Sequence, residues 1–174
     1  MTYRYGRDWH GKLRKPMQEI TEAQARKRFT DGPHLSVSRV DAAGEVPDYT
    51  LVLQPGAAYV RSSRYDGHGR EVSVYHFREQ DDHPGELFLE EVTVRVYPDG
   101  EERWLDVAGS KAHTTVTFRP NGWARARFAV PGLDQARVEE FTGVDVSGHW
   151  VQRPEFGDWD GLGEAREPAL PTGG

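Results

Sequence analysis

The feature that most constrains this chain is the stretch from Glu86 to Val107, ELFLEEVTVRVYPDGEERWLDV. Apolar and polar residues alternate through its first half, which is the period of a β-strand. Asp99-Gly100 at its centre favours the positive φ angles of a tight turn, and Pro98 fixes its own φ and lacks an amide donor. The stretch therefore predicts a long antiparallel hairpin, with one strand on each side of Gly100.

The same alternation recurs on both sides of this stretch. We predict further strands at 35–40, 49–54, 57–65, 71–78, 112–119 and 123–130, and a polar loop at 79–85. Most of the strands end at turns that contain Gly, Pro or Asn. The pattern predicts a mainly β fold, an antiparallel meander of about eight strands that forms a barrel or a two-layer sheet.

Helical signals are few. Thr21-Glu22-Ala23-Gln24 matches a capping box, so we predict a short N-terminal helix from Glu22 to Phe29. A second, short helix is expected after Asp134, through Phe141, and a last strand at 144–151. The chain is expected to contain one β-rich domain, 20–151, after an irregular arm, 1–19, that Tyr3, Tyr5 and Trp9 tie down. A Pro/Gly-rich acidic tail, 152–174, would follow, disordered over 169–174.

Composition limits the possible functions. The net charge of −6 argues against binding to nucleic acid, which needs clustered positive charge. The absence of cysteine excludes disulfides, thiolate catalysis and Cys-based zinc sites. We expect no metal and no cofactor, because no ligand cluster or nucleotide motif is present. The N-terminus has no apolar signal region and no run approaches the ~18 apolar residues of a membrane span, which predicts a soluble, cytoplasmic protein.

Alternation gives each strand two faces with different chemistry. In the central strand we predict that the buried side carries Phe88, Glu90, Val92, Val94 and Val96, and the other side Leu87, Leu89, Glu91, Thr93, Arg95 and Tyr97. Arg and aromatic residues on comparable faces predict a single binding surface formed by Tyr59, Arg61, Arg95, Tyr97, Trp123, Arg125 and Arg127. Such residues are enriched at binding hot spots. The alternative is a solvated sheet face whose Arg stems cover aromatic rings.

Two titratable residues stand out on apolar faces. Glu90 shares its side with four apolar residues, so that burial would raise its pKa and suit it to general acid or base catalysis. The alternative is that it reaches solvent near the strand end. His76 lies on one side with Val72 and Val74, where a hydrogen-bonded core histidine is the simpler interpretation. We assign no catalytic residue.

These observations favour a non-catalytic binding module that engages an acidic protein partner through its Arg/aromatic face, as an immunity-type domain of bacteria or an adaptor would. The alternative is a small-molecule-binding β-barrel, with or without catalysis, that acts on an anionic or planar ligand. A protein partner is favoured over a small molecule, and neither nucleic acid nor a membrane is expected. The side of the sheet that faces inward distinguishes the two hypotheses.

Overall fold

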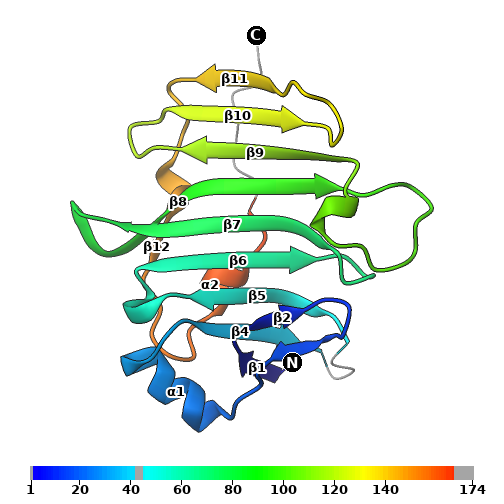
Figure 1. The fold of residues 1–174 in the computed structure, drawn as a ribbon. Helices are drawn as coiled ribbons and strands as arrows, with labels where there is room; N and C mark the ends of the chain where they lie inside the picture. The colour runs from blue at the N-terminus through cyan, green and yellow to red at the C-terminus, as the bar shows by residue number, and fades with distance from the viewer. Residues whose placement is uncertain (1, 42–44, 167–174) are drawn as a thin grey trace.

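The computed structural model describes residues 2–41 and 45–166. Its main feature is a 10-stranded antiparallel sheet (Figure 1) in which β4 to β11 follow one another as neighbours. Their bounds are β4 Leu35–Val40, β5 Pro47–Leu53, β6 Tyr59–Tyr65, β7 Glu71–Gln80, β8 His83–Val96, β9 Ala112–Phe118, β10 Ala124–Ala129 and β11 Arg137–Phe141. Strand β1 (Thr2–Gly6) adds to β4, and β12 (Trp150–Gln152) pairs with β8. The mainly β meander is confirmed.

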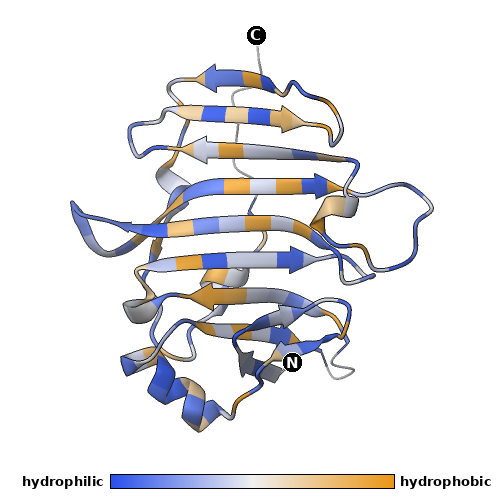
Figure 2. Ribbon diagram, in the orientation of Figure 1, coloured by the Kyte–Doolittle hydropathy of each residue, from blue (hydrophilic) through white to orange (hydrophobic). Residues whose placement is uncertain are grey.

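The sheet is open and has one covered face. Among the described residues its end strands, β1 and β11, do not pair with each other, so no barrel forms. Figure 2 shows the alternation of hydrophobic and hydrophilic residues along the strands. We call the buried side, which carries Leu51, Val60, Phe77, Leu89 and Val116, the core face, and the other side the front face.

A second layer of short segments covers the core face. The chain after β11 passes behind the sheet (Figure 1) and contributes the 3₁₀-helix η3 (Ser147–His149), β12 and α2 (Asp160–Gly163). Trp159 and Leu162 belong to the hydrophobic core. Residues 152–166, which the sequence assigned to a tail, thus pack against the sheet, whereas the predicted disorder at 169–174 lies outside the described residues.

The N-terminal helix forms as predicted and extends slightly further, as α1 (Glu22–Asp31). Thr21 and Gln24 form the capping box: the Thr21 hydroxyl accepts from the Gln24 amide, and the Gln24 side chain accepts from the Thr21 amide. Ala25 is fully buried, and Phe29 packs against Trp159 with ring centroids 5.6 Å apart. Packing of this one face stabilises a helix too short to persist alone.

The arm at 1–19, predicted as irregular, is mostly β-structure. Besides β1, it contains a small hairpin of β2 (Asp8–His10) and β3 (Lys15–Met17), drawn in front of the sheet in Figure 1. Tyr5 and Trp9 are both 7% exposed, so they do tie the arm down. The strands are too short for a visible alternation, which is why the sequence did not predict them.

The predicted hairpin around Gly100 is half correct. Its first strand is β8, but no strand follows at 101–107, where the chain forms a loop and the 3₁₀-helix η2 (Val107–Gly109). Strands β7 and β9 pair with the two edges of β8, so no edge is left for a strand immediately after the turn. Gly100 does adopt a positive φ, of 73°. The tight hairpin lies instead at 81–82, inside the predicted polar loop.

A β-bulge in β8 reverses the predicted burial of its first half. His76 lies opposite Glu91, but the next residue, Phe77, lies opposite Leu89. Glu90 is therefore the extra residue of the bulge, and alternation resumes one position out of phase. A prediction based on uninterrupted alternation necessarily fails beyond this point.

Exposure confirms the shift of phase. Phe88 and Val92 are buried, as predicted, but Leu87 and Leu89 are fully buried as well. Val94 and Val96 follow the bulge and keep the phase of the buried Val92, yet they are 46% and 47% exposed, so the bulge does not account for their exposure. The predicted burial was wrong for seven residues: Leu87, Leu89, Glu90, Thr93, Val94, Val96 and Tyr97.

The predictions for 134–151 were also wrong in detail. The segment expected to be helical contains strand β11, whose Val138 is 42% exposed. Pairing with β10 satisfies the backbone groups of this segment. The last predicted strand is reduced to β12. No helix in the described part of the chain has the length and apolar character needed to span a membrane.

Candidate functional site

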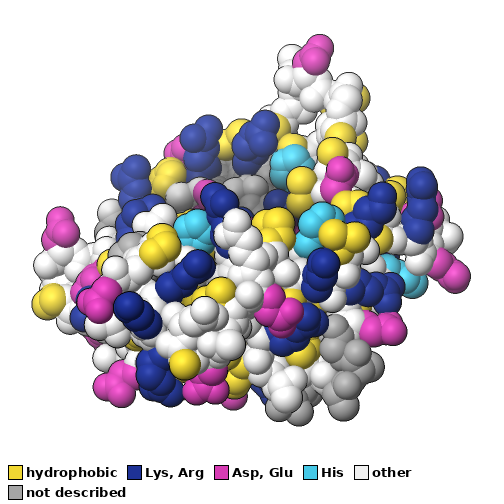
Figure 3. All heavy atoms as spheres, turned by 60° about the horizontal axis from the view of Figure 1, so that its bottom comes forward, with side chains coloured by type: hydrophobic (Ala, Val, Ile, Leu, Met, Phe, Trp, Pro, Cys, Tyr) yellow, Lys and Arg dark blue, Asp and Glu magenta, His cyan; other side chains and the backbone are white. Residues whose placement is uncertain are grey.

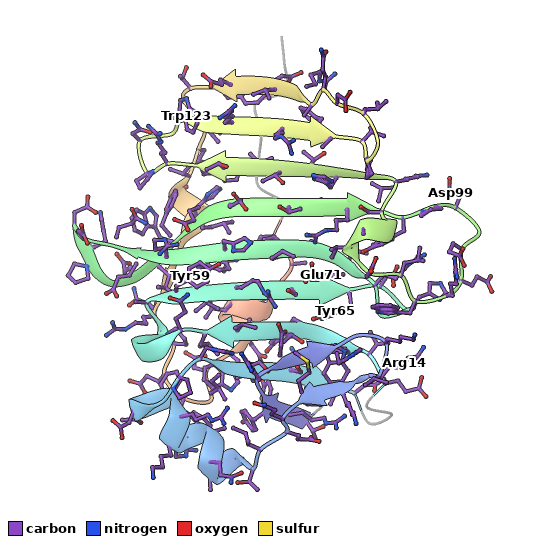
Figure 4. The ribbon with its side chains drawn as sticks, in the orientation of Figure 1. Arg14, Tyr59, Tyr65, Glu71, Asp99 and Trp123 are labelled. Atoms are coloured by element: carbon purple, nitrogen blue, oxygen red, sulfur yellow. The ribbon has the colours of Figure 1, made fainter. Side chains whose placement is uncertain are left out.

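The front face brings most of the predicted binding residues onto one surface. Across the sheet, Arg61 on β6 is opposite His76, which is followed by Glu91, Thr117 and Arg125 on the next three strands. Alternation puts Tyr59 beside Arg61, Arg127 beside Arg125, and Arg95 on the same side as Glu91. In Figure 4, Tyr59 and Tyr65 stand at opposite ends of β6, and Trp123 marks the beginning of β10.

The arginines in the middle of this face are neutralised. Arg61 Nη2 lies 2.8 Å from Asp8 Oδ2, and Arg95 Nη1 lies 2.6 Å from Glu71 Oε1. The Arg95 and Glu71 side chains are only 18% and 20% exposed. Both arginines already have a carboxylate partner within the protein, and Arg95 is too buried for the exposed binding role predicted for it.

Tyr97 is likewise a packing residue. It is 7% exposed, and its hydroxyl donates to the Glu71 carbonyl oxygen at 3.1 Å. The Arg70 guanidinium carbon lies 4.9 Å from the centroid of the Tyr97 ring. The structure thus separates Tyr97 from the exposed part of the predicted surface.

The arginines near the β11 edge differ from those in the middle. Arg125 and Arg127 are exposed, and neither forms an ion pair within the described residues. Glu140 stands opposite Arg125 in the register, yet no ion pair joins the two side chains. The Arg119 guanidinium carbon lies 4.5 Å from the Trp123 ring centroid. We call Arg119, Trp123, Arg125 and Arg127 the arginine edge.

The positive charge of the arginine edge is not shared by the rest of the molecule. In Figure 3, which brings the α1 end forward, Lys and Arg side chains are mixed with Asp and Glu. The chain as a whole carries a net charge of −6. An unpaired group of three guanidiniums therefore stands out against an acidic average.

A pocket of about 400 Å³ opens beside the arginine edge. Its lining includes Tyr59, His76, Glu91 and Arg119. The Tyr59 hydroxyl lies 2.6 Å from His76 Nδ1, and His76 Nε2 lies 3.9 Å from Glu91 Oε1. Burial and the nearby arginines lower the pKa of His76, so its imidazole is neutral at pH 7.

The two acidic residues of this pocket have different surroundings. The bulge directs both Glu90 and Glu91 into it. Both oxygens of Glu90 accept from Arg78 Nε, at 3.0 and 3.2 Å. Burial raises the pKa of Glu91, and the charge of Glu90 raises it further. Of the two candidates from the sequence, His76 is hydrogen-bonded as predicted but lines a pocket on the front face rather than belonging to the core, and Glu90 belongs to an ion pair.

A second pocket, of about 220 Å³, lies at the other end of the front face. It is enclosed by the β2–β3 hairpin, by β6 and β7, and by the loop between β8 and β9. Its aromatic residues are Trp9, Tyr65 and Trp104, and its charged residues include Asp8, Arg61 and Glu71. Figure 4 shows Tyr65 and Glu71 at this end of the sheet, near the loop that carries Asp99.

Sequence reasoning missed Asp8 and Trp104 as site residues. Asp8 lies in the arm that was predicted to be irregular. Trp104 lies at 101–107, where the predicted second strand of the hairpin does not form. These two residues line a pocket because three segments that are distant in sequence meet there. The alternation of residues within one strand cannot predict such a contact.

The described residues contain no group of three or more His, Asp or Glu side chains placed to hold a metal ion. Comparisons with protein-family models, with curated proteins and with solved structures found no match to this chain. The geometry of the front face is therefore the basis for any functional argument.

Proposed function

We propose that this protein is a non-catalytic binding module that engages an acidic protein partner through the arginine edge. The observation that carries the proposal is the absence of carboxylate partners for Arg119, Arg125 and Arg127 among the described residues. Guanidinium groups form bidentate hydrogen bonds with carboxylates, so a partner's Asp and Glu side chains would supply what these arginines lack.

Aromatic and hydroxyl groups around the edge suit it to contact with a protein. Trp123 offers apolar area beside Arg119, and Thr117 lies between Arg125 and Glu91 in the register. Aromatic residues and arginines together are typical of interface hot spots. The neighbouring pocket of about 400 Å³ is large enough to receive one side chain from the partner.

The test uses a defined acidic probe, a fluorescent oligo-glutamate peptide, and fluorescence anisotropy. We expect the parent protein to bind it at low salt and Arg125→Gln/Arg127→Gln to bind about tenfold more weakly or worse, since each charge-assisted contact contributes about 1.5–3 kcal/mol. Binding should weaken as salt is added, because exposed charges are screened.

The matched control is Arg26→Gln/Arg103→Gln, which removes the same charge away from the arginine edge. These side chains are 61% and 74% exposed, and each already pairs with a carboxylate. We expect this variant to retain binding. Equal weakening in both double variants would mean that bulk charge, not the arginine edge, attracts the probe, and a parent protein that does not bind the peptide would refute the proposal.

A further inference from the structure

We infer that the pocket of about 220 Å³ binds a neutral, planar lactam heterocycle, the chemical class to which the nucleobases belong. This site lies at the opposite end of the front face from the arginine edge and does not depend on the proposed partner. The inference rests on the aromatic walls, on the unused hydrogen-bonding groups and on the balance of charge around the pocket.

Aromatic side chains from three separate segments form the walls. Trp9 comes from the hairpin, Tyr65 from β6 and Trp104 from the loop between β8 and β9. The hairpin and this loop are in close contact: a Cβ atom at Gly11 would lie only 2.5 Å from Trp104 Nε1. Flat apolar walls favour a planar ligand, because every aromatic ring has a π-face for stacking.

Hydrogen-bonding groups of both kinds remain unused at the pocket. Arg61 lines the pocket and donates to Asp8 through Nη2, and its Nη1 forms no hydrogen bond within the described residues. Nε also lacks an acceptor there but is buried from solvent, so Nη1 is the donor that remains for a ligand carbonyl. Glu71 accepts from Arg95 through Oε1, which leaves Oε2 for a ligand N–H. A ring with a carbonyl beside an N–H, which is a lactam, satisfies both.

The charges at the pocket disfavour an anionic ligand. Asp8 is balanced by Arg61 and Glu71 by Arg95. Burial above all, and then the carboxylates of Glu71 and Asp8, raise the pKa of Tyr65, so its hydroxyl stays protonated. Asp106 adds one more carboxylate to the lining, which disfavours an anion.

The size of the pocket limits the ligand to one or two rings. Its volume is below the roughly 300–1,000 Å³ that is typical of sites for drug-sized molecules. A polymer could place only one of its units in the pocket, and that unit would have to be turned out from the rest of the polymer.

Three planar probes of similar size separate the possible classes: hypoxanthine, a neutral lactam; benzoate, an anion; and benzamidine, a cation. Isothermal titration calorimetry should show hypoxanthine binding about tenfold or more tightly than either charged probe. If benzoate or benzamidine binds as well as hypoxanthine, or if hypoxanthine does not bind, the inference fails.

Two variants locate the binding. Arg61→Lys keeps the charge beside Asp8 and removes the guanidinium fork, and Trp104→Ala removes one wall outside the sheet. Each should weaken hypoxanthine binding by about tenfold or more while circular dichroism remains that of the parent. Should Arg61→Lys fail to fold, Trp104→Ala alone decides, and unchanged affinity in that variant would overturn the inference.

The two binding sites can be tested independently. Arg125→Gln/Arg127→Gln should bind hypoxanthine like the parent, and Trp104→Ala should bind the oligo-glutamate peptide like the parent. Loss of hypoxanthine binding in the arginine-edge variant would show that the probe binds there, and would contradict the assignment to this pocket.

Discussion

At the scale of single residues, the arginines of the front face differ in their surroundings. Arg95 and Glu71 form a largely buried pair, whereas Arg125 stands exposed without an ion pair in the described structure. Removal of one member of a buried pair leaves the other without compensation. Substitution by alanine should therefore lower the stability of the fold at Arg95 and weaken partner binding at Arg125.

We expect Arg95→Ala to lower the free energy of unfolding by about 1–3 kcal/mol, since it leaves the Glu71 carboxylate unpaired. Arg125→Ala, the matched control, should change it by less than about 0.5 kcal/mol, as is usual for exposed positions. Urea denaturation followed by circular dichroism measures both. Similar midpoints for the two variants would mean that the Arg95–Glu71 pair contributes nothing to stability.

Alternation in the sequence predicted the shared face but not the pairing on it. Tyr59, Arg61 and Arg125 lie on one surface because β6 and β10 keep a period of two at these positions and the register aligns the strands between them. Asp8 neutralises Arg61 across 53 positions of sequence. No pattern within a strand indicates which arginine a distant carboxylate will reach.

At the scale of elements, α1 is the segment that local sequence determines most completely. The residues that cap the helix, form its first turn and end it are close together in sequence. The structure contains the capping box that they predict. Thr21→Ala should lower the free energy of unfolding by about 1 kcal/mol through loss of the cap.

A control for the helix cap is Thr21→Ser, which keeps a hydroxyl able to accept from the Gln24 amide. We expect its denaturant midpoint to match that of the parent. If Thr21→Ala also matches the parent, α1 contributes little to the stability of the fold.

The strands were predictable where turn residues mark both ends, as in β4 and β9. They were not predictable where tertiary pairing decides. The bulge at Glu90 and the short strands β2 and β3 depend on partners elsewhere in the chain. Gly100 has the positive φ that the sequence predicted, yet the strand expected after it is absent, because β9 occupies that edge of β8.

At the scale of the whole molecule, Asp160 fastens the C-terminal segment to the sheet. Its Oδ1 accepts from the Tyr49 and Tyr3 hydroxyls at 2.7 and 2.8 Å, and from Arg39 Nη1 at 3.3 Å. These three residues lie on β5, β1 and β4, so one carboxylate connects α2 to three strands. Trp159, the preceding residue, is fully buried, which links this contact to the core.

The charge of Asp160 makes the attachment dependent on pH. Hydrogen bonds from Tyr49 and Tyr3, and then the charge of Arg39, lower the pKa of Asp160 below its ordinary value of 3.8. A group with a lowered pKa in the folded state stabilises the fold above its unfolded pKa, and this stabilisation is lost as pH falls through the folded value. Asp160→Asn removes the titration but keeps an oxygen acceptor.

We therefore expect Asp160→Asn to melt at a lower temperature than the parent at about pH 6, and the difference between the two to shrink as the pH falls to about 3. Differential scanning calorimetry across this range measures it. Asp158→Asn is the matched control, because no tyrosine hydroxyl donates to Asp158 in the described structure, and its melting temperature should follow that of the parent throughout. A difference between Asp160→Asn and the parent that stays constant with pH would show that hydrogen-bond geometry, rather than the charge of Asp160, holds the C-terminal segment on the sheet.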